Sequence, residues 1–164
     1  EVWGFMPGQR AESVFMETWY DGLVEASDTV LDSAGWQQVL AVKTAVAKQL
    51  EAMRKDGTIG SSLDAEVTLY CDEALHASLA KLENELRFVL ITSEATAMPL
   101  QAAPSDALET DLPGLRVTVI ASGHAKCPRC WHHRADVGVS SDHPELCGRC
   151  VENVEGQGEH RRYA

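Results

Sequence analysis

Four of the five cysteines form two Cys-x-x-Cys pairs, Cys127 with Cys130 and Cys147 with Cys150, and 16 residues separate the pairs. This spacing is typical of zinc sites. Each pair can form a tight turn that directs two sulfurs to one point, so four thiolates can surround a zinc ion at about 2.3 Å. Four thiolates leave no coordination position for an activated water. We therefore expect one structural Zn²⁺ and no catalytic residue, and we expect Gly148 to support the second turn by adopting a positive φ.

Other uses of these cysteines are open. A Cys-x-x-Cys pair can be a redox dithiol, although no thioredoxin-like βαβ pattern surrounds either pair. A histidine could also replace one thiolate, but four sulfurs already complete a tetrahedron. The histidines concerned are His124, His132, His133 and His143.

Planar and cationic side chains are concentrated around the cysteines. Such groups can stack on unpaired bases and bind phosphates, so they are candidates for contact with RNA. The candidates are Arg129, Trp131, His132, Arg149, Arg161 and Arg162. Alternatively, the arginines offset the roughly −2 charge of a tetrathiolate zinc site, and Trp131 packs inside the small domain.

The charge of the chain is unevenly distributed. The net charge of −11 argues against bulk electrostatic coating of nucleic acid. Residues 1–122 carry 8 Lys/Arg against 19 Asp/Glu, whereas residues 123–164 carry 6 of each. Any contact with a polyanion should therefore be made by residues 123–164. No apolar run is long enough to span a bilayer and no signal peptide is evident, so we expect a cytoplasmic protein that has no membrane partner.

Hydrophobic periodicity predicts an α+β fold, in which a helical segment joins a small β-α-β-like unit followed by a four-cysteine zinc finger. Asp32 or Ser33 should begin an amphipathic helix that Gly57 closes. Asp72 should cap a second helix that continues to about residue 90, and the alternative for residues 88–91 is an extended run. The expected strands are 65–71, 94–100 and 115–121, and residues 102–114 should form a solvated loop.

Three segments follow from this pattern: residues 1–60 with the helical region, residues 61–122 with the α/β unit, and residues 123–164 with the zinc-binding tail. The tail has few large apolar side chains, so zinc should supply the stability that its core cannot. Because the sequence begins at Glu1 with apolar residues following at once, we interpret the chain as a fragment.

Four stretches of sequence carry a resemblance to a known family. KCPRCWHHRADVG at 126–138 and HPELCGRCVENVEGQGEHRRYA at 143–164 resemble the C-terminal zinc segment of bacterial isoleucyl-tRNA synthetases. WGFMPGQRAESVFMETWYDGL at 3–23 and ELRFVLITSEA at 85–95 are similar to the end of the anticodon-binding region of that family and to the α/β unit that follows it.

This resemblance implies a piece of a class I aminoacyl-tRNA synthetase, an ATP-dependent ligase with a Rossmann-type catalytic core and an editing domain. Neither domain, and neither nucleotide-binding signature of the family, is found in this sequence. The resemblance implies that residues 1–60 end the anticodon-binding region and that the cysteines bind zinc. It also implies that the partners are the anticodon side of tRNA(Ile) and the catalytic core of the parent chain. ATP would bind only in the parent enzyme, so this piece should be inactive alone.

Two other functions remain open. Similar four-cysteine zinc fingers occur in DNA glycosylases of the formamidopyrimidine type, where a basic finger grips duplex DNA. A zinc-stabilised protein-interaction module without any nucleic-acid role would also suit a neutral tail and an acidic body.

Overall fold

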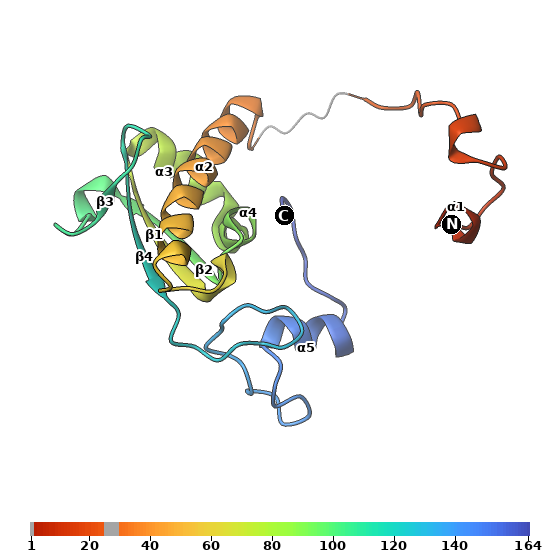
Figure 1. Ribbon diagram of the computed structural model, residues 1–164. Coiled ribbons are helices and arrows are strands. Elements are labelled where there is room, and N and C mark those ends of the chain that lie inside the picture. Colours follow the sequence, from red (N-terminus) through yellow and green to blue (C-terminus); the bar gives the residue numbers. More distant parts are fainter. Residues whose placement is uncertain (1, 25–29) are drawn as a thin grey trace.

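A 23-residue helix, α2 (Ser33–Lys55), packs along a small mixed sheet in the computed structural model, which describes residues 2–24 and 30–164 (Figure 1). The predicted caps of this helix are confirmed. Asp32 accepts a hydrogen bond from the Gly35 backbone N–H at 2.8 Å, and Gly57 follows the helix with a φ of +82°. Glu1 and residues 25–29, which belong to the predicted segment 1–60, lie outside the described residues.

The sheet has four strands in the order β2-β1-β4-β3. Strand β1 (Ala65–Cys71) pairs in parallel with β2 (Glu94–Pro99) and antiparallel with β4 (Leu115–Ala121). These three strands match the predicted ones closely. The fourth, β3 (Leu108–Glu109), was not predicted, because its two residues lie in the segment that we expected to be only a solvated loop.

The connection between β1 and β2 is helical but interrupted. It comprises α3 (Glu73–Leu79), a 3₁₀ segment (Ala80–Glu85) and α4 (Leu86–Leu90). Asp72 caps α3 as predicted, accepting a hydrogen bond from the Leu75 backbone N–H at 2.9 Å. Glu83 breaks the expected continuous helix with a φ of +46°, and Ile91 ends α4 in the left-handed region. The result is a parallel β-α-β unit with a kink before α4.

Helix α2 and the sheet share one hydrophobic core. Val39 and Val42 of α2 are buried in the same cluster as Leu69 of β1 and Val117 of β4. Crossover residues such as Leu79 and Leu82 complete this cluster. The helix predicted for the first segment is therefore packed on the α/β unit. The three domain boundaries themselves remain predictions.

Residues 2–24 expose most of their large apolar side chains. This segment contains the short helix α1 (Val2–Phe5) and a 3₁₀ turn (Val14–Met16), and it lies apart from the sheet in Figure 1. Phe15 and Trp19 are 95% and 97% exposed. Aromatic surface of this extent is normally buried in a soluble protein.

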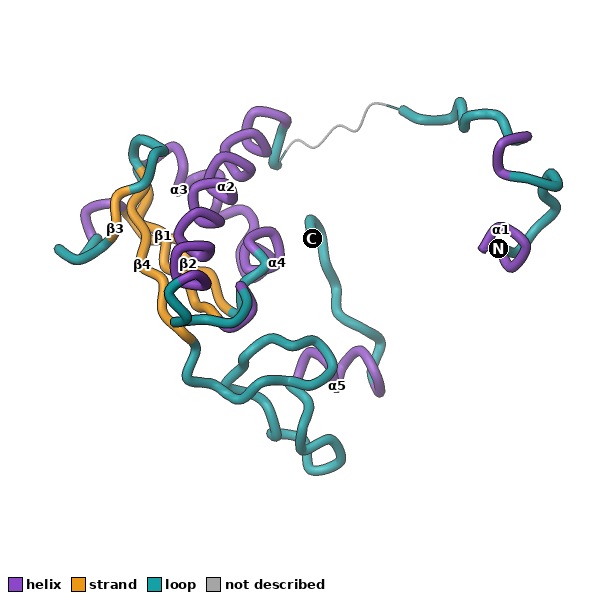
Figure 2. Tube along the Cα trace, viewed as in Figure 1, coloured by secondary structure: helices purple, strands orange, loops and turns teal. Residues whose placement is uncertain are grey.

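Residues 123–164 form a tail that is mostly loop, as Figure 2 shows. Its regular element is helix α5 (Gly148–Glu155). The tail, which is described throughout, buries Leu146 and three of its four cysteines, with Val137 and Val151 packed against them. This confirms the predicted α+β fold followed by a cysteine-centred finger. Among the described residues, no helix combines the length and apolarity needed to cross a membrane.

The shared core predicts a large penalty for shortening Leu69, which is fully buried in β1. Leu69→Ala should lower the free energy of unfolding by about 2–5 kcal/mol, because it removes buried methyl groups and leaves a cavity. Leu40→Ala on the exposed face of α2 is the matched control and should change it by less than about 0.5 kcal/mol. Urea unfolding followed by circular dichroism checks both values. Equal effects of the two substitutions would contradict this description of the core.

Candidate metal centre

The first cysteine pair lies in a tight hairpin. Lys126 and His133 form an antiparallel bridge at its base. Inside it, the Cys127 backbone N–H donates to the His132 carbonyl at 2.9 Å, and the Trp131 N–H donates to the Cys127 carbonyl at 2.8 Å. Trp131 closes the turn with a φ of +66°, a conformation that is unusual for a bulky residue. The turn therefore orients both sulfurs of this pair toward one point.

The second pair lies at the start of helix α5. Cys147 is the N-cap residue and Cys150 lies in the first turn, so the helix sets their separation. The expectation that Gly148 has a positive φ is wrong, since Gly148 begins the helix and is not among the described glycines in that region. Instead, the nearby Asp136 carboxylate leaves no room for a side chain at position 148. Its N–H donates to the Asp136 carboxylate at 3.2 Å, and an added Cβ would lie 2.9 Å from the same oxygen.

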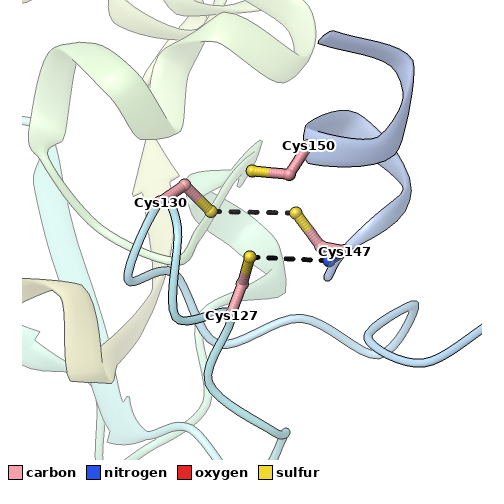
Figure 3. Close-up of side chains that lie close together, drawn as sticks. All are labelled: Cys127, Cys130, Cys147 and Cys150. Carbon is pink, nitrogen blue, oxygen red and sulfur yellow. Dashed lines mark hydrogen bonds between the residues drawn. The ribbon is translucent and has the colours of Figure 1, made fainter. Parts of the chain in front are cut away.

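The two turns bring the four cysteine sulfurs together, as Figure 3 shows. All four sulfur atoms lie within 4.8 Å of one another, and those of Cys130 and Cys147 are 3.7 Å apart. A tetrahedral zinc site with bonds of about 2.3 Å has sulfur–sulfur edges of about 3.8 Å. The cluster therefore fits one structural Zn²⁺. Cys127, Cys147 and Cys150 are buried and Cys130 is half-buried, so a bound ion would be largely shielded from water.

Hydrogen-bond donors favour the thiolate of Cys127, whereas burial raises the pKa of the Cys130 and Cys147 thiols. Burial raises the pKa of the Cys127 thiol, but backbone N–H groups, that of Cys147 above all, lower this pKa to about 6. The Cys147 N–H lies 3.5 Å from the Cys127 sulfur. The Arg129 guanidinium donates to the Cys150 sulfur, also at 3.5 Å. Thiolates are the form that binds metal, so these donors assist coordination.

The cluster contains no histidine among the described residues. The His132 ring nitrogen Nδ1 lies 3.1 Å from the Cys130 carbonyl oxygen, and His133 Nδ1 lies 2.8 Å from the His124 carbonyl oxygen. His143 pairs with Glu155 at 2.9 Å. The ring nitrogens of these histidines thus have polar partners other than a metal ion.

The six candidates for RNA contact separate into two groups. Arg129 and Trp131 are exposed beside the cysteines. The other four lie close to α4: the rings of His132 and Phe88 meet edge to face, and Arg149 lies over Phe88. Arg161 also lies over Phe88. Arg162 is exposed, and it donates to Glu85 through its backbone N–H.

Ser93 connects the first hairpin to the sheet, and its role was not predicted. It is fully buried, and its hydroxyl accepts the His133 N–H at 2.6 Å while donating to the Leu63 carbonyl. Arg134 adds an ion pair with Glu94 at the start of β2. A buried serine directly before a strand gives no signal of a contact 40 residues away, so sequence reasoning had little means to find it.

Comparison with known proteins gives two findings. A family model described as "Zinc finger found in FPG and IleRS" matches residues 126–153. The whole chain is also 60% identical to part of the isoleucine–tRNA ligase of Pseudomonas aeruginosa, and 56% and 54% identical to the isoleucine–tRNA ligases of Azotobacter vinelandii and Pseudomonas putida. Each match covers the whole of this chain and 18% of the relative. The chain therefore spans about a fifth of the length of these proteins. The matched part is the C-terminal region, which confirms the resemblance inferred from the sequence.

The geometry predicts that removing one cysteine of the cluster releases the metal and unfolds the tail. Cys147→Ala should reduce zinc from about one ion per chain to below about 0.1, because three thiolates cannot close the site. Elemental analysis measures the metal, and amide exchange should show lost protection in residues 123–164 with β1 and β4 still protected.

Cys71→Ala is the control. Burial raises the pKa of this thiol to about 12, and it lies in β1, in the core rather than in the cluster. This variant should keep its zinc. An exchange-protected tail in the zinc-depleted Cys147→Ala protein would contradict the claim that the metal stabilises it.

Proposed function

We propose that this chain is the C-terminal part of an isoleucine–tRNA ligase and that its zinc-binding tail contacts tRNA(Ile). The observation that carries the proposal is 60% identity over the entire chain, from the aromatic segment to the tail. The zinc finger alone would be less specific, because its family model covers two kinds of protein. The proposed ligase is a cytoplasmic, ATP-dependent enzyme whose catalytic core lies in the rest of the parent chain.

In this proposal Cys127, Cys130, Cys147 and Cys150 are the zinc ligands. When bound, the ion supplies structural cross-linking and no reactive water, because four thiolates complete its coordination. The side chains of the tail then provide the surface that contacts tRNA. The hairpin of the first pair and the start of α5 are held in one arrangement, which a tail with so few buried side chains could not maintain alone.

Arg129 and Trp131 are the side chains best placed to contact RNA. Trp131 is 62% exposed, and the hydrogen bonds of the hairpin hold its backbone beside the metal cluster. An exposed indole can stack on an unpaired base, and a nearby guanidinium can bind a phosphate. His132, Arg149, Arg161 and Arg162 remain candidates, although in this structure the first three pack on Phe88. Arg162 contacts the body through its backbone N–H.

The charge distribution supports contact through the tail and not through the body. Residues 1–122 are strongly acidic and would repel a polyanion, whereas residues 123–164 are balanced. We propose that the tail holds the anticodon side of the tRNA, so that the acceptor end is correctly placed in the distant catalytic core. The exposed aromatic groups of residues 2–24 would pack against that parent chain.

Two other functions are less well supported. A DNA-repair glycosylase finger would share the cysteine spacing, but the similarity to isoleucine–tRNA ligases extends far beyond the finger. A protein-interaction module would also suit the metal cluster, but the 60% identity to an isoleucine–tRNA ligase over the whole chain favours the proposed function. Binding measurements distinguish all three.

The proposal predicts selective RNA binding at low salt. Fluorescence anisotropy should show tighter binding of tRNA(Ile) than of another tRNA or duplex DNA. Trp131→Ala should weaken tRNA(Ile) binding by about 5- to 150-fold, since stacking on a base is worth about 1–3 kcal/mol. Arg129→Gln should weaken binding and reduce its salt dependence.

Arg54→Gln is the matched control, because Arg54 lies at the end of α2 and pairs with Glu51, away from the tail. It should leave binding unchanged. A preference for duplex DNA would refute the proposed function, and equal losses for Arg54→Gln and Arg129→Gln would refute contact through the tail.

A further inference from the structure

Phe88 of α4 is surrounded by cationic and aromatic side chains from two parts of the chain. The guanidinium of Arg87, its neighbour in α4, lies 4.7 Å from the ring centroid. From the tail, Arg149 and Arg161 lie 5.0 and 4.2 Å from it, and the His132 ring meets it edge to face at 5.7 Å. Cations over an aromatic face are attracted by its quadrupole. Phe88 therefore receives three side chains of the tail.

Glu159 connects this aromatic site to the metal-bearing helix. Its carboxylate lies 2.6 Å from Arg161 and 3.4 Å from Arg149, which is on α5 directly before Cys150. Asn153 of α5 also donates to this carboxylate, at 3.2 Å. Burial raises the pKa of Glu159, but the two arginines and Asn153 lower it below its usual range. The carboxylate thus links both arginines above the Phe88 ring.

Glu85 binds the backbone of the residues that follow. Its carboxylate accepts three N–H groups, those of Arg162, Tyr163 and Ala164, at 2.6 to 2.9 Å. Burial raises the pKa of Glu85, but these donors lower it below its usual range, so the carboxylate is ionised at neutral pH. The Tyr163 ring also packs edge to face on Trp36 of α2, with centroids 6.0 Å apart.

These contacts form a second anchor for the tail. The first anchor holds the hairpin through Ser93 and through Asp64, which lies 3.4 Å from His133. One anchor alone leaves a small unit able to pivot. Two anchors on different elements fix its direction, because the hairpin is held at the end of the sheet and α5 is held at α4.

We propose that Glu85 and Phe88 are positioning residues that fix the orientation of the zinc-binding tail relative to the sheet. Their effect on RNA binding rests on the proposed function, whereas their effect on orientation does not. Glu85 acts through the backbone of residues 162–164. Phe88 acts through Arg149, Arg161 and His132, and neither residue is a metal ligand. The tail consequently presents Arg129 and Trp131 in a single direction as long as the contacts of Glu85 and Phe88 are intact.

The test uses the full zinc-loaded chain and nuclear magnetic resonance. Glu85→Gln keeps the side-chain shape but places an amide N–H₂ against backbone donors, and Phe88→Leu keeps apolar volume but removes the aromatic face. In both variants, backbone order parameters of residues 159–164 should fall from about 0.85 to below about 0.6. Residual dipolar couplings of residues 126–155 should no longer fit the alignment tensor of residues 65–121. Zinc content should stay at one ion per chain.

Glu83→Gln makes the same substitution at an exposed position two residues away and should change none of these values. Order parameters near 0.85 and a single shared tensor in Glu85→Gln would overturn the proposal, even if Phe88→Leu fails to fold. If the orientation changes as expected but wild-type protein does not bind tRNA(Ile), the anchor stands and the proposed function fails. If tRNA(Ile) binds, Glu85→Gln should weaken binding at least about 3-fold with unchanged zinc.

Discussion

The attraction between four thiolates and one metal ion is the interaction on which the arrangement of the tail depends. Within residues 123–164, all of which are described, the buried side chains are Leu146 and three of the cysteines. Such a core cannot offset the conformational entropy of about 40 residues. Zinc binding to sites of this kind is worth about 10–16 kcal/mol in apparent terms, which exceeds the net stability of many whole domains.

The metal sets the internal shape of the tail, and the α/β unit sets its direction. Ser93 stands directly before β2 and Phe88 lies in the middle of α4, so the tail contacts the crossover within α4 and at the turn that follows it. Because α2 shares the hydrophobic core of the sheet, this support is a packed unit. The surface of the tail is therefore built from a metal centre, a packed scaffold and polar contacts between them.

Local features were predictable from the sequence, and contacts between distant segments were not. Residue types and spacing within short stretches of sequence predicted the caps at Asp32 and Asp72 and the strand at 65–71. The spacing of the two cysteine pairs likewise predicted the cysteine cluster. The kink at Glu83 and the two-residue strand β3 have no comparable signal. The contact of Glu85 with residues 162–164 joins positions almost 80 residues apart, and no periodicity encodes such a pairing. Arginines suited to RNA were identified from their chemistry, but only the fold shows that Arg149 and Arg161 lie on Phe88.

X-ray absorption spectroscopy at the zinc edge, on protein purified without added metal, measures the central interaction most directly. One zinc ion per chain should be found with four sulfur neighbours at about 2.3 Å and no nitrogen or oxygen ligand. A first shell with fewer than four sulfurs, or a protein that carries no zinc while its tail remains ordered, would contradict the structural role assigned to the metal.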